Sequence, residues 1–241
     1  MKTSKTQTVI VAGGTGNIGI GIVKHFYDNG AKVIVPYRNE AKLGALKSYV
    51  DNDDESRLVA IKTDLSSFDT ALNLQRELLK WNETIDIAVA SLGGWWHGGR
   101  LSEVEYKDYN QVMNENVHSH FYFARSIAPL LIKQGSGTYV SINGPGGIYA
   151  RPGTELIAMA GWMQLKMTEF LNAELRENGA KAYQLIIAGI YTRQFSKPIT
   201  AEMITPEEIG NHIQKIHNGE IDNRDKVAQT FYRINLPGFK I

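Results

Sequence analysis

The sequence contains no cysteine in 241 residues. This absence excludes disulfide bonds, thiolate metal sites and a thiol nucleophile. The chain also lacks an apolar run of transmembrane length, and a short polar lead, MKTSKTQ, stands where a signal peptide would carry its apolar segment. We therefore expect a cytoplasmic protein without a membrane partner.

Charge of either sign is not in excess. The 26 Lys and Arg residues nearly balance the 25 Asp and Glu residues, so no nucleic-acid partner is expected. Hydrophobic residues make up 43% of the chain, which is enough for one sizeable core at this length. No linker, repeat or low-complexity segment divides it. We expect a single domain over 1–241, with a core at about 8–195 and a variable, substrate-side part at about 195–241.

Short apolar runs alternate with amphipathic stretches of helix length. The expected strands lie in TVIVAGG, AKVIVPY, RLVAIKTDL, IDIAVASLGG, GTYVSING, KAYQLIIAG and KVAQTFYRI. Helices are expected at 17–29, 40–50, 68–81, 105–133 and 153–170, and another after Thr205-Pro206. Continuous apolar strands separated by helices are typical of right-handed βαβ units. The predicted fold class is α/β, a single doubly wound Rossmann-type domain with a central parallel sheet.

The first strand is followed by a glycine-rich turn, GGTGNIGIG, at the start of the first helix. Gly13, Gly16 and Gly19 would let the turn be tight and let backbone N–H groups approach a pyrophosphate. The positive end of the helix dipole lies behind them. A glycine triplet at the first β-to-α turn of an alternating chain therefore predicts a dinucleotide site.

The end of the second strand indicates which dinucleotide binds. An acidic residue there would bind the adenosine ribose hydroxyls and repel a 2′-phosphate. The sequence instead has Tyr37 and Arg38, and a guanidinium can pair with a phosphate. NADP(H) is therefore favoured over NAD(H). Asp64, after the third strand, is expected either to accept a hydrogen bond from the adenine amino group or to cap the following turn.

Taken in order, these motifs resemble the short-chain dehydrogenase/reductase family from about Val9 to Arg193. The resemblance is carried by the glycine turn, KTDLS, VASLGG, MNENVHSHFYFARSIAPLL, GTYVSINGPGG and LIIAGIYTR. It implies an oligomer, a dimer or a tetramer, formed through the helices at 105–133 and 153–170. It also implies that the cofactor is lined by Thr15, Ile18, Leu65, Ala90, Gly93 and Gly189.

Two segments resemble the dihydropteridine reductase branch of that family. They are GGWWHGG, at 93–99, and GPGGIYARPGTELIAMAG, which includes Pro152-Gly153. Trp95 and Trp96 would either stack on a flat ligand or cover the nicotinamide, or they would pack beneath the loop or in an interface.

The family generally works with an Asn, a Ser, a Tyr and a Lys, the Tyr supplying the proton at the substrate oxygen. The resemblance places the Asn at Asn116. The Ser position falls on Gly144, the Tyr position on Ile157 and the Lys position on Gly161. Isoleucine and glycine cannot transfer a proton, so standard carbonyl and alcohol oxidoreduction is expected to be impaired.

Three hypotheses are compatible with this pattern: two functions, and a protein that keeps the fold but binds no nucleotide. The first is an NADP(H)-binding protein with a degenerate site, acting as a non-catalytic or partner subunit, alone or with an intact relative. The second is an enzyme with altered chemistry acting on a small molecule, either an atypical NADPH-dependent reductase or a non-redox isomerase, cyclase or dehydratase. Tyr149 and His97 are the candidate proton donors of this second reading, because both lie in loops at strand ends.

The other titratable residues considered, two histidines and a lysine, are not expected to take part in catalysis or metal binding. His118 and His120 are expected to be helix-surface or subunit-contact residues and not a metal pair, because an i, i+2 spacing puts them on different faces. Lys166 is expected to point away from the site, since the shift of five residues from the Lys position turns it about 140° around the helix. No cluster has the spacing of metal ligands.

Overall fold

The computed structural model describes residues 6–51, 54–81, 84–147, 151–192, 198–221 and 226–233. Its centre is a seven-stranded sheet in the order β3-β2-β1-β4-β5-β6-β7, with every neighbouring pair parallel. The strands are β1 (Thr8–Ala12), β2 (Lys32–Tyr37), β3 (Leu58–Lys62), β4 (Ile87–Ala90), β5 (Thr138–Asn143), β6 (Lys181–Ile187) and β7 (Ala228–Phe231).

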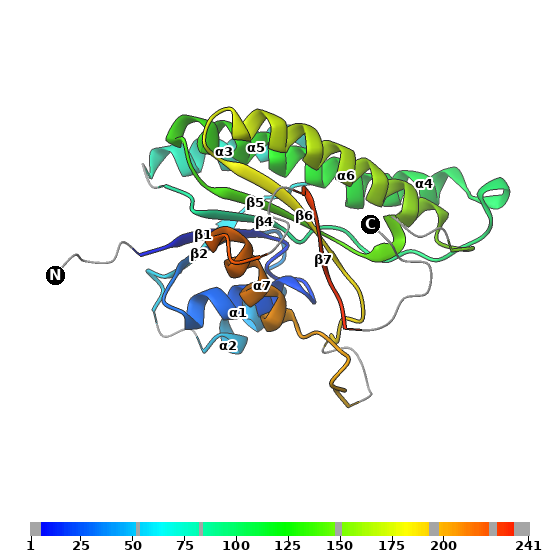
Figure 1. Ribbon diagram of the computed structural model, residues 1–241, viewed down its shortest axis with the longest axis horizontal. Helices are drawn as coiled ribbons and strands as arrows, with labels where there is room; N and C mark the ends of the chain where they lie inside the picture. The colour runs from blue at the N-terminus through cyan, green and yellow to red at the C-terminus, as the bar shows by residue number, and fades with distance from the viewer. Residues whose placement is uncertain are drawn as a thin grey trace.

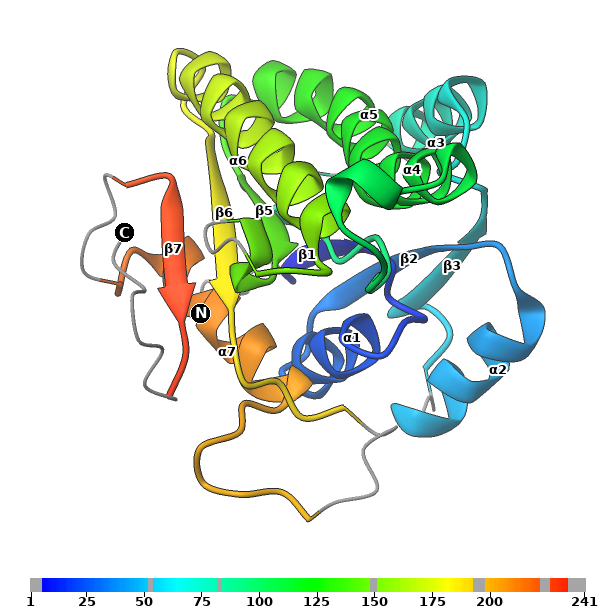
Figure 2. The same ribbon diagram turned by 90° about the vertical axis from the view of Figure 1, so that its right-hand side faces the viewer.

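Helices cover both faces of the sheet, as Figures 1 and 2 show. One face carries α1 (Gly19–Asp28), α2 (Glu40–Tyr49) and α7 (Pro206–Asn218). The opposite face carries α3 (Phe68–Lys80), α5 (Ser119–Gln134) and α6 (Glu155–Arg176), and α4 (Tyr106–Met113) extends this layer. This is the doubly wound arrangement that the sequence predicts.

The central strands show why the apolar runs are continuous. All five residues of β1 are buried. Val9 and Val11 pack with the α1 and α7 layer, whereas Ile10 and Ala12 pack with the α3, α5 and α6 layer. A strand covered on both faces needs apolar side chains at every position.

The long helix expected at 105–133 is not continuous. A π-helical turn at Asn114–His118 separates α4 from α5. A π turn inserts one extra residue into the helix and often marks a functional position. Here the inserted turn contains Asn116, which is buried. The periodicity of the sequence could not show the interruption, because one extra residue changes the apolar pattern little.

Several element ends differ by a few residues from the expectation. The first helix begins at Gly19 and not at 17, and α6 begins at Glu155 and continues to Arg176. The expected start of α7 is confirmed: the Thr205 hydroxyl accepts from the Glu208 N–H in a capping box, with Pro206 in the first turn. A 3₁₀ turn at Leu101–Glu103 and another at Pro145–Gly147 complete the described elements.

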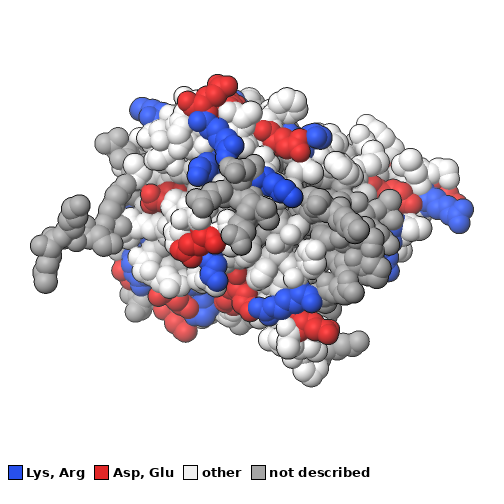
Figure 3. Space-filling model, viewed as in Figure 1, with Lys and Arg blue, Asp and Glu red and all other residues white. Residues whose placement is uncertain are grey.

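The surface carries charges of both signs. On the face shown in Figure 3, Lys and Arg are interspersed with Asp and Glu. No helix in the described ranges combines the length and apolar character that crossing a membrane requires. The cytoplasmic location expected from the sequence remains a prediction.

Helices α1 and α7 approach each other through glycine. A Cβ atom added at Gly21 would lie 2.4 Å from the Cβ atom of Pro206, and one at Gly210 would lie 2.6 Å from that of His25. Both distances are below contact distance, so a methyl group at either position would push the helices apart. The packing of α7 against the first βα unit therefore depends on glycine.

We predict that Gly21→Ala destabilises the protein by about 1–3 kcal/mol through overpacking at this contact. Gly44→Ala on α2 is the matched control, because a Cβ atom there meets nothing within 4 Å. That control should be stabilising by about 0.5–1 kcal/mol through helix propensity. Urea unfolding midpoints measure both changes, and equal effects of the two substitutions would contradict the packing argument.

Candidate functional site

A groove runs along the carboxyl ends of the parallel strands. It consists of two adjoining cavities of about 730 Å³ and 400 Å³. Gly16, Ser91, Leu92 and Gly93 line both of them. The shared residues lie after β1 and β4, where the strand order reverses, and a doubly wound sheet binds its ligands at this point.

The glycine turn is packed tightly against the neighbouring strand end. Gly13 has φ +76°, and a Cβ atom on it would lie 2.0 Å from the Ser91 carbonyl oxygen. A Cβ atom on Gly19 would lie 2.1 Å from the Gly13 carbonyl oxygen. Gly19 therefore serves packing, whereas Gly13, Thr15 and Gly16 line the narrow cavity.

Helix α1 leaves the backbone N–H groups of Ile18 and Gly19 available to an anion at its first turn, whereas those of Ile20 and Gly21 donate to the Gly16 and Ile18 carbonyls. Its N-cap residue, Ile18, makes no side-chain capping bond, and the turn contains no acidic residue. Helix N-termini present unsatisfied N–H donors and a partial positive charge. An external anion, such as the pyrophosphate of a dinucleotide, would satisfy them. The residues present therefore fit such a cofactor.

The narrow cavity has basic side chains at its rim. Arg38 is exposed and lies 3.7 Å from the Asp64 carboxylate, and Lys42 lies beside it. The sequence analysis did not predict a role for Lys42. Its place in the first turn of α2, just after the second strand, could have indicated one. Tyr37 also lines this cavity, and its hydroxyl donates to Glu40 at 3.3 Å.

Asp64 and Leu65 form the opposite side of the narrow cavity. The Asp64 carboxylate accepts from the Ser66 N–H at 3.0 Å. This bond caps the turn after β3, one of the two roles expected for Asp64. The carboxylate still lines the cavity, so the role toward adenine remains a prediction.

Asn116 fixes the loop that follows β4. Its side-chain oxygen accepts from the Gly94 N–H at 3.2 Å, and its side-chain nitrogen donates to the Val112 carbonyl at 3.1 Å. Gly93 has φ +102°, and a Cβ atom on it would lie 2.2 Å from the Asn116 amide oxygen. The loop therefore approaches Asn116 closely because it has glycine at 93.

The expectation for Ala90 needs correction. Ala90 is fully buried within β4, and neither cavity is lined by it. The next two residues, Ser91 and Leu92, line the groove instead. The first side chain to line the groove is thus that of Ser91, one residue after the position that the resemblance implied. Ile18 and Gly189 line the wide cavity, and their contact with a cofactor remains a prediction.

The positions aligned with the family's Ser, Tyr and Lys lie around the wide cavity. Gly144 and Ile157 line it, and Gly161 is buried in α6 behind it. Asn143 joins these segments, because its side-chain nitrogen donates to the Gly161 carbonyl at 3.2 Å and its oxygen accepts from the Gly144 N–H at 2.8 Å. The amide of Asn143 is therefore used to attach β5 to α6.

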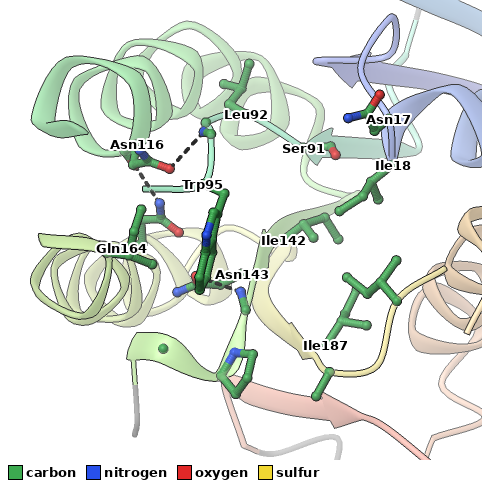
Figure 4. Close-up of a pocket in the computed structure, with 18 of the residues that line it drawn as sticks. Asn17, Ile18, Ser91, Leu92, Trp95, Asn116, Ile142, Asn143, Gln164 and Ile187 are labelled. Atoms are coloured by element: carbon green, nitrogen blue, oxygen red, sulfur yellow. Dashed lines mark hydrogen bonds between the residues drawn. The ribbon is translucent and has the colours of Figure 1, made fainter. Parts of the chain in front are cut away.

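The two adjacent tryptophans have different environments. Trp95 is 73% exposed and lines the wide cavity, as Figure 4 shows. Trp96 is partly buried and packs against the cluster of Val112, Met113, Val117, Leu156 and Ala160. Trp96 therefore packs beneath the loop, whereas the stacking of Trp95 on a ligand or on the nicotinamide remains a prediction.

His97 lies away from the wide cavity. Its ring covers Gly153, where a Cβ atom would lie 2.6 Å from the ring Nε2. The Gly98 N–H donates to the Gly153 carbonyl at 3.0 Å. The glycine-rich loop at 93–99 is thus packed against the turn at Pro152-Gly153, and His97 is not among the described residues that line either cavity.

The expectation that His120 lies on a helix surface is wrong. His118 is exposed, but His120 is fully buried. The His120 Nε2 donates to the Leu92 carbonyl at 3.1 Å, and its Nδ1 accepts from the Ser141 hydroxyl at 3.2 Å. Burial lowers the pKa of His120 to about 4, so the ring is neutral at pH 7. His120 therefore anchors the start of the loop after β4.

Gln164 lines the wide cavity but did not emerge from the sequence. It is 3% exposed, and its side-chain nitrogen donates to the Asn116 carbonyl at 2.5 Å. Its spacing from Ile157 and Gly161 places it on the same face of α6. A polar residue on this face of α6 could have indicated from the sequence that Gln164 lines the site. Lys166, by contrast, is exposed and pairs with Glu169 at 2.6 Å, as expected.

Tyr149 and Arg193 lie outside the described residues. Within the part of the chain that the structure describes, no group of three His, Asp or Glu residues lies close enough together to hold a metal ion.

Comparison with known proteins supports the fold and the family. A family model described as short chain dehydrogenase matches residues 7–202. The chain is 24% identical over 230 residues to dehydrogenase/reductase SDR family member 4 of Caenorhabditis elegans, with 93% of this chain and 86% of the relative covered. It is 21% identical over 231 residues to 2,5-dichloro-2,5-cyclohexadiene-1,4-diol dehydrogenase LinX of Sphingobium indicum, with 92% and 86% covered.

Solved structures share the fold. The structure described as ElxO with NADP bound has a TM-score of 0.82 and 18% identity, with 93% of this chain and 96% of that chain covered. A metagenomic short-chain oxidoreductase in complex with NADP has a TM-score of 0.77 and 19% identity, with the same coverage. At these identities the likeness concerns the fold alone.

The buried neutral His120 predicts how stability changes with pH. Its pKa is lower in the folded protein than in the unfolded chain, so the unfolded chain binds a proton first as the pH falls below about 6.5. Stability is then lost down to about pH 4, at up to about 1.4 kcal/mol per pH unit for this histidine.

We predict that His120→Gln reduces this loss between pH 6.5 and 4, because glutamine does not titrate. The exposed His118→Gln is the control and should keep the wild-type pH dependence. Urea unfolding at several pH values measures the slopes. A slope that is the same in His120→Gln and in the wild-type protein would contradict a buried neutral histidine.

Proposed function

Because the chain belongs to the short-chain dehydrogenase family, we propose that it binds NADP(H) in the groove without performing the family's Tyr- and Lys-assisted hydride transfer. The observation that carries this proposal is the combination of a complete cofactor groove with Ile157 in the wall of the cavity. The protein then acts as a non-catalytic or partner subunit that senses cofactor and a small ligand.

Cofactor binding is supported by the geometry of the groove. The glycine turn, the open first turn of α1 and the loop after β4 meet at the reversal of strand order. The preference for NADP(H) is supported by Arg38 and Lys42 at the rim of the narrow cavity, where a 2′-phosphate would find two cations. Two solved proteins of similar fold are described with NADP bound.

The lack of standard chemistry is supported by the residues around the wide cavity. Ile157 presents an apolar side chain, and the Asn143 amide is used to join β5 to α6. Among the described residues of the lining there is no Tyr, His, Lys, Asp or Glu. A reaction that needs proton transfer at the substrate oxygen lacks a donor in this set.

An oligomer is supported by an apolar surface on α5 and α6. Phe121, Met159, Trp162, Met163 and Phe170 are all exposed. Exposed apolar side chains gathered on neighbouring helices mark interaction surfaces. We propose that they pack against a second copy of the chain or against a catalytically intact relative, giving a dimer or a tetramer.

The alternative function is an enzyme with altered chemistry. The observation that favours it is the size of the wide cavity, about 730 Å³, which leaves room for a substrate beside a nicotinamide ring. The cofactor itself supplies hydride, so a reactive substrate needs little acid catalysis from the protein. Tyr149, His97 or a water molecule would then supply the proton, or the pocket would catalyse a non-redox isomerisation, cyclisation or dehydration.

We predict that NADPH raises the melting temperature and that NADH does so less. Arg38→Ala should weaken NADPH binding by roughly tenfold, the effect of one lost phosphate contact, and leave NADH binding unchanged. Arg76→Ala, an exposed arginine on α3 that pairs with Asn73, is the control and should change neither. Equal loss of NADH and NADPH affinity in Arg38→Ala would contradict the assigned 2′-phosphate site.

We predict that NADPH oxidation with simple aldehydes and ketones is slower than in an intact family member by a factor on the order of 10²–10⁴, the usual contribution of a general acid. Single-turnover absorbance at the nicotinamide band measures the rate. Rapid turnover that is abolished by Ile157→Ala would contradict the proposal. Rapid turnover lost in Tyr149→Phe or His97→Ala would establish the alternative function in its place.

A further inference from the structure

Gln164 has a fixed orientation in the wall of the wide cavity. Its side-chain nitrogen donates to the Asn116 carbonyl at 2.5 Å. If the Gln164 amide were reversed, its oxygen would lie at this distance from the Asn116 carbonyl oxygen, and two acceptors would repel each other. The atom beside Asn116 is therefore the nitrogen of Gln164. The side-chain oxygen of Gln164 must therefore lie on the other side.

That oxygen has no hydrogen-bond donor among the described residues, and it is buried. Figure 4 shows the Gln164 carboxamide between Asn116 and Trp95, with its oxygen on the side of Trp95. A buried acceptor without a partner has lost its water and gained nothing in return. Capping the Asn116 carbonyl uses only the nitrogen, so this role alone does not account for the oxygen.

The rest of the wide cavity is mostly apolar. Its walls include Ile18, Leu92, Ile142, Ile157 and Ile187. Arg151 is the one charged residue among the described residues of the lining, and it is exposed. No ion pair of Arg151 occurs within the described ranges.

From these contacts we propose that the wide cavity binds a small carboxylic acid with an apolar body and a hydroxyl or N–H group. Gln164 accepts a hydrogen bond from that group, and Arg151 pairs with the carboxylate. The apolar body lies against the isoleucine walls and Trp95. This assignment rests on the proposed function in one respect, since it places the acid beside the nicotinamide end of the cofactor.

The ligand class can be tested with hydroxybenzoates as probes. Each of the ortho, meta and para isomers is compared with the fluorobenzoate of the same substitution pattern, which is similar in size but has no donor. Isothermal titration is carried out on the protein with and without NADPH. The wild-type protein should bind at least one hydroxybenzoate at least about tenfold more tightly than its fluoro partner, the effect of satisfying a buried acceptor.

Gln164→Leu should reduce this preference to near unity. If the leucine variant does not fold, Gln164→Met is used in its place, because methionine is unbranched and similar in length to glutamine. Arg151→Gln should weaken both members of a pair by the same factor, because it removes only the carboxylate partner. These two patterns separate ligand recognition from a merely structural role of Gln164.

Three results would overturn the inference: no binding of any hydroxybenzoate at millimolar concentration, equal binding of the paired probes by the wild-type protein, or a preference that persists in Gln164→Leu and Gln164→Met. The NADPH titration in the same samples reports on the proposed function separately. If NADPH does not bind, that function fails, and the probe comparison on the cofactor-free protein still decides the role of Gln164.

Discussion

The groove depends on one close backbone contact, between Gly13 at the end of β1 and the carbonyl of Ser91 at the end of β4. The space that a Cβ atom on Gly13 would need lies only 2.0 Å from the Ser91 oxygen. The chain leaves these neighbouring strands toward opposite faces of the sheet. The contact therefore brings the glycine turn and the loop after β4 together, and both cavities share the residues that follow it.

The π turn in the long helical region extends this arrangement to the wide cavity. Asn116 uses its side chain to hold the loop after β4 and its carbonyl to receive Gln164 from α6. His120 holds the same loop two residues earlier, at Leu92. The two cavities thus share the loop after β4, which a buried amide and a neutral imidazole hold in place. Neither of these two side chains exchanges a proton at neutral pH.

Much of this could be predicted from the sequence. The continuous apolar strands, the glycine turn and the capping signals at Thr205 are local patterns with strong physical causes, and the structure confirms the fold that they predict. Gly144 and Ile157, which the resemblance aligns with the family's Ser and Tyr, both line one cavity. The burial of His120 and the contacts of Gln164 did not, because both depend on which helices pack together. Trp95 and Trp96 share a sequence context, and only tertiary packing separates them.

A crystal structure of the protein with NADP⁺ bound would test the account most directly. The account predicts the 2′-phosphate against Arg38 and Lys42, and the nicotinamide in the wide cavity near Ile18 and Ile157, with no tyrosine, histidine or lysine side chain beside it. A 2′-phosphate without a cationic partner would contradict the cofactor assignment. A tyrosine, histidine or lysine beside the nicotinamide, Tyr149 included, would contradict the claim that the site lacks a proton donor.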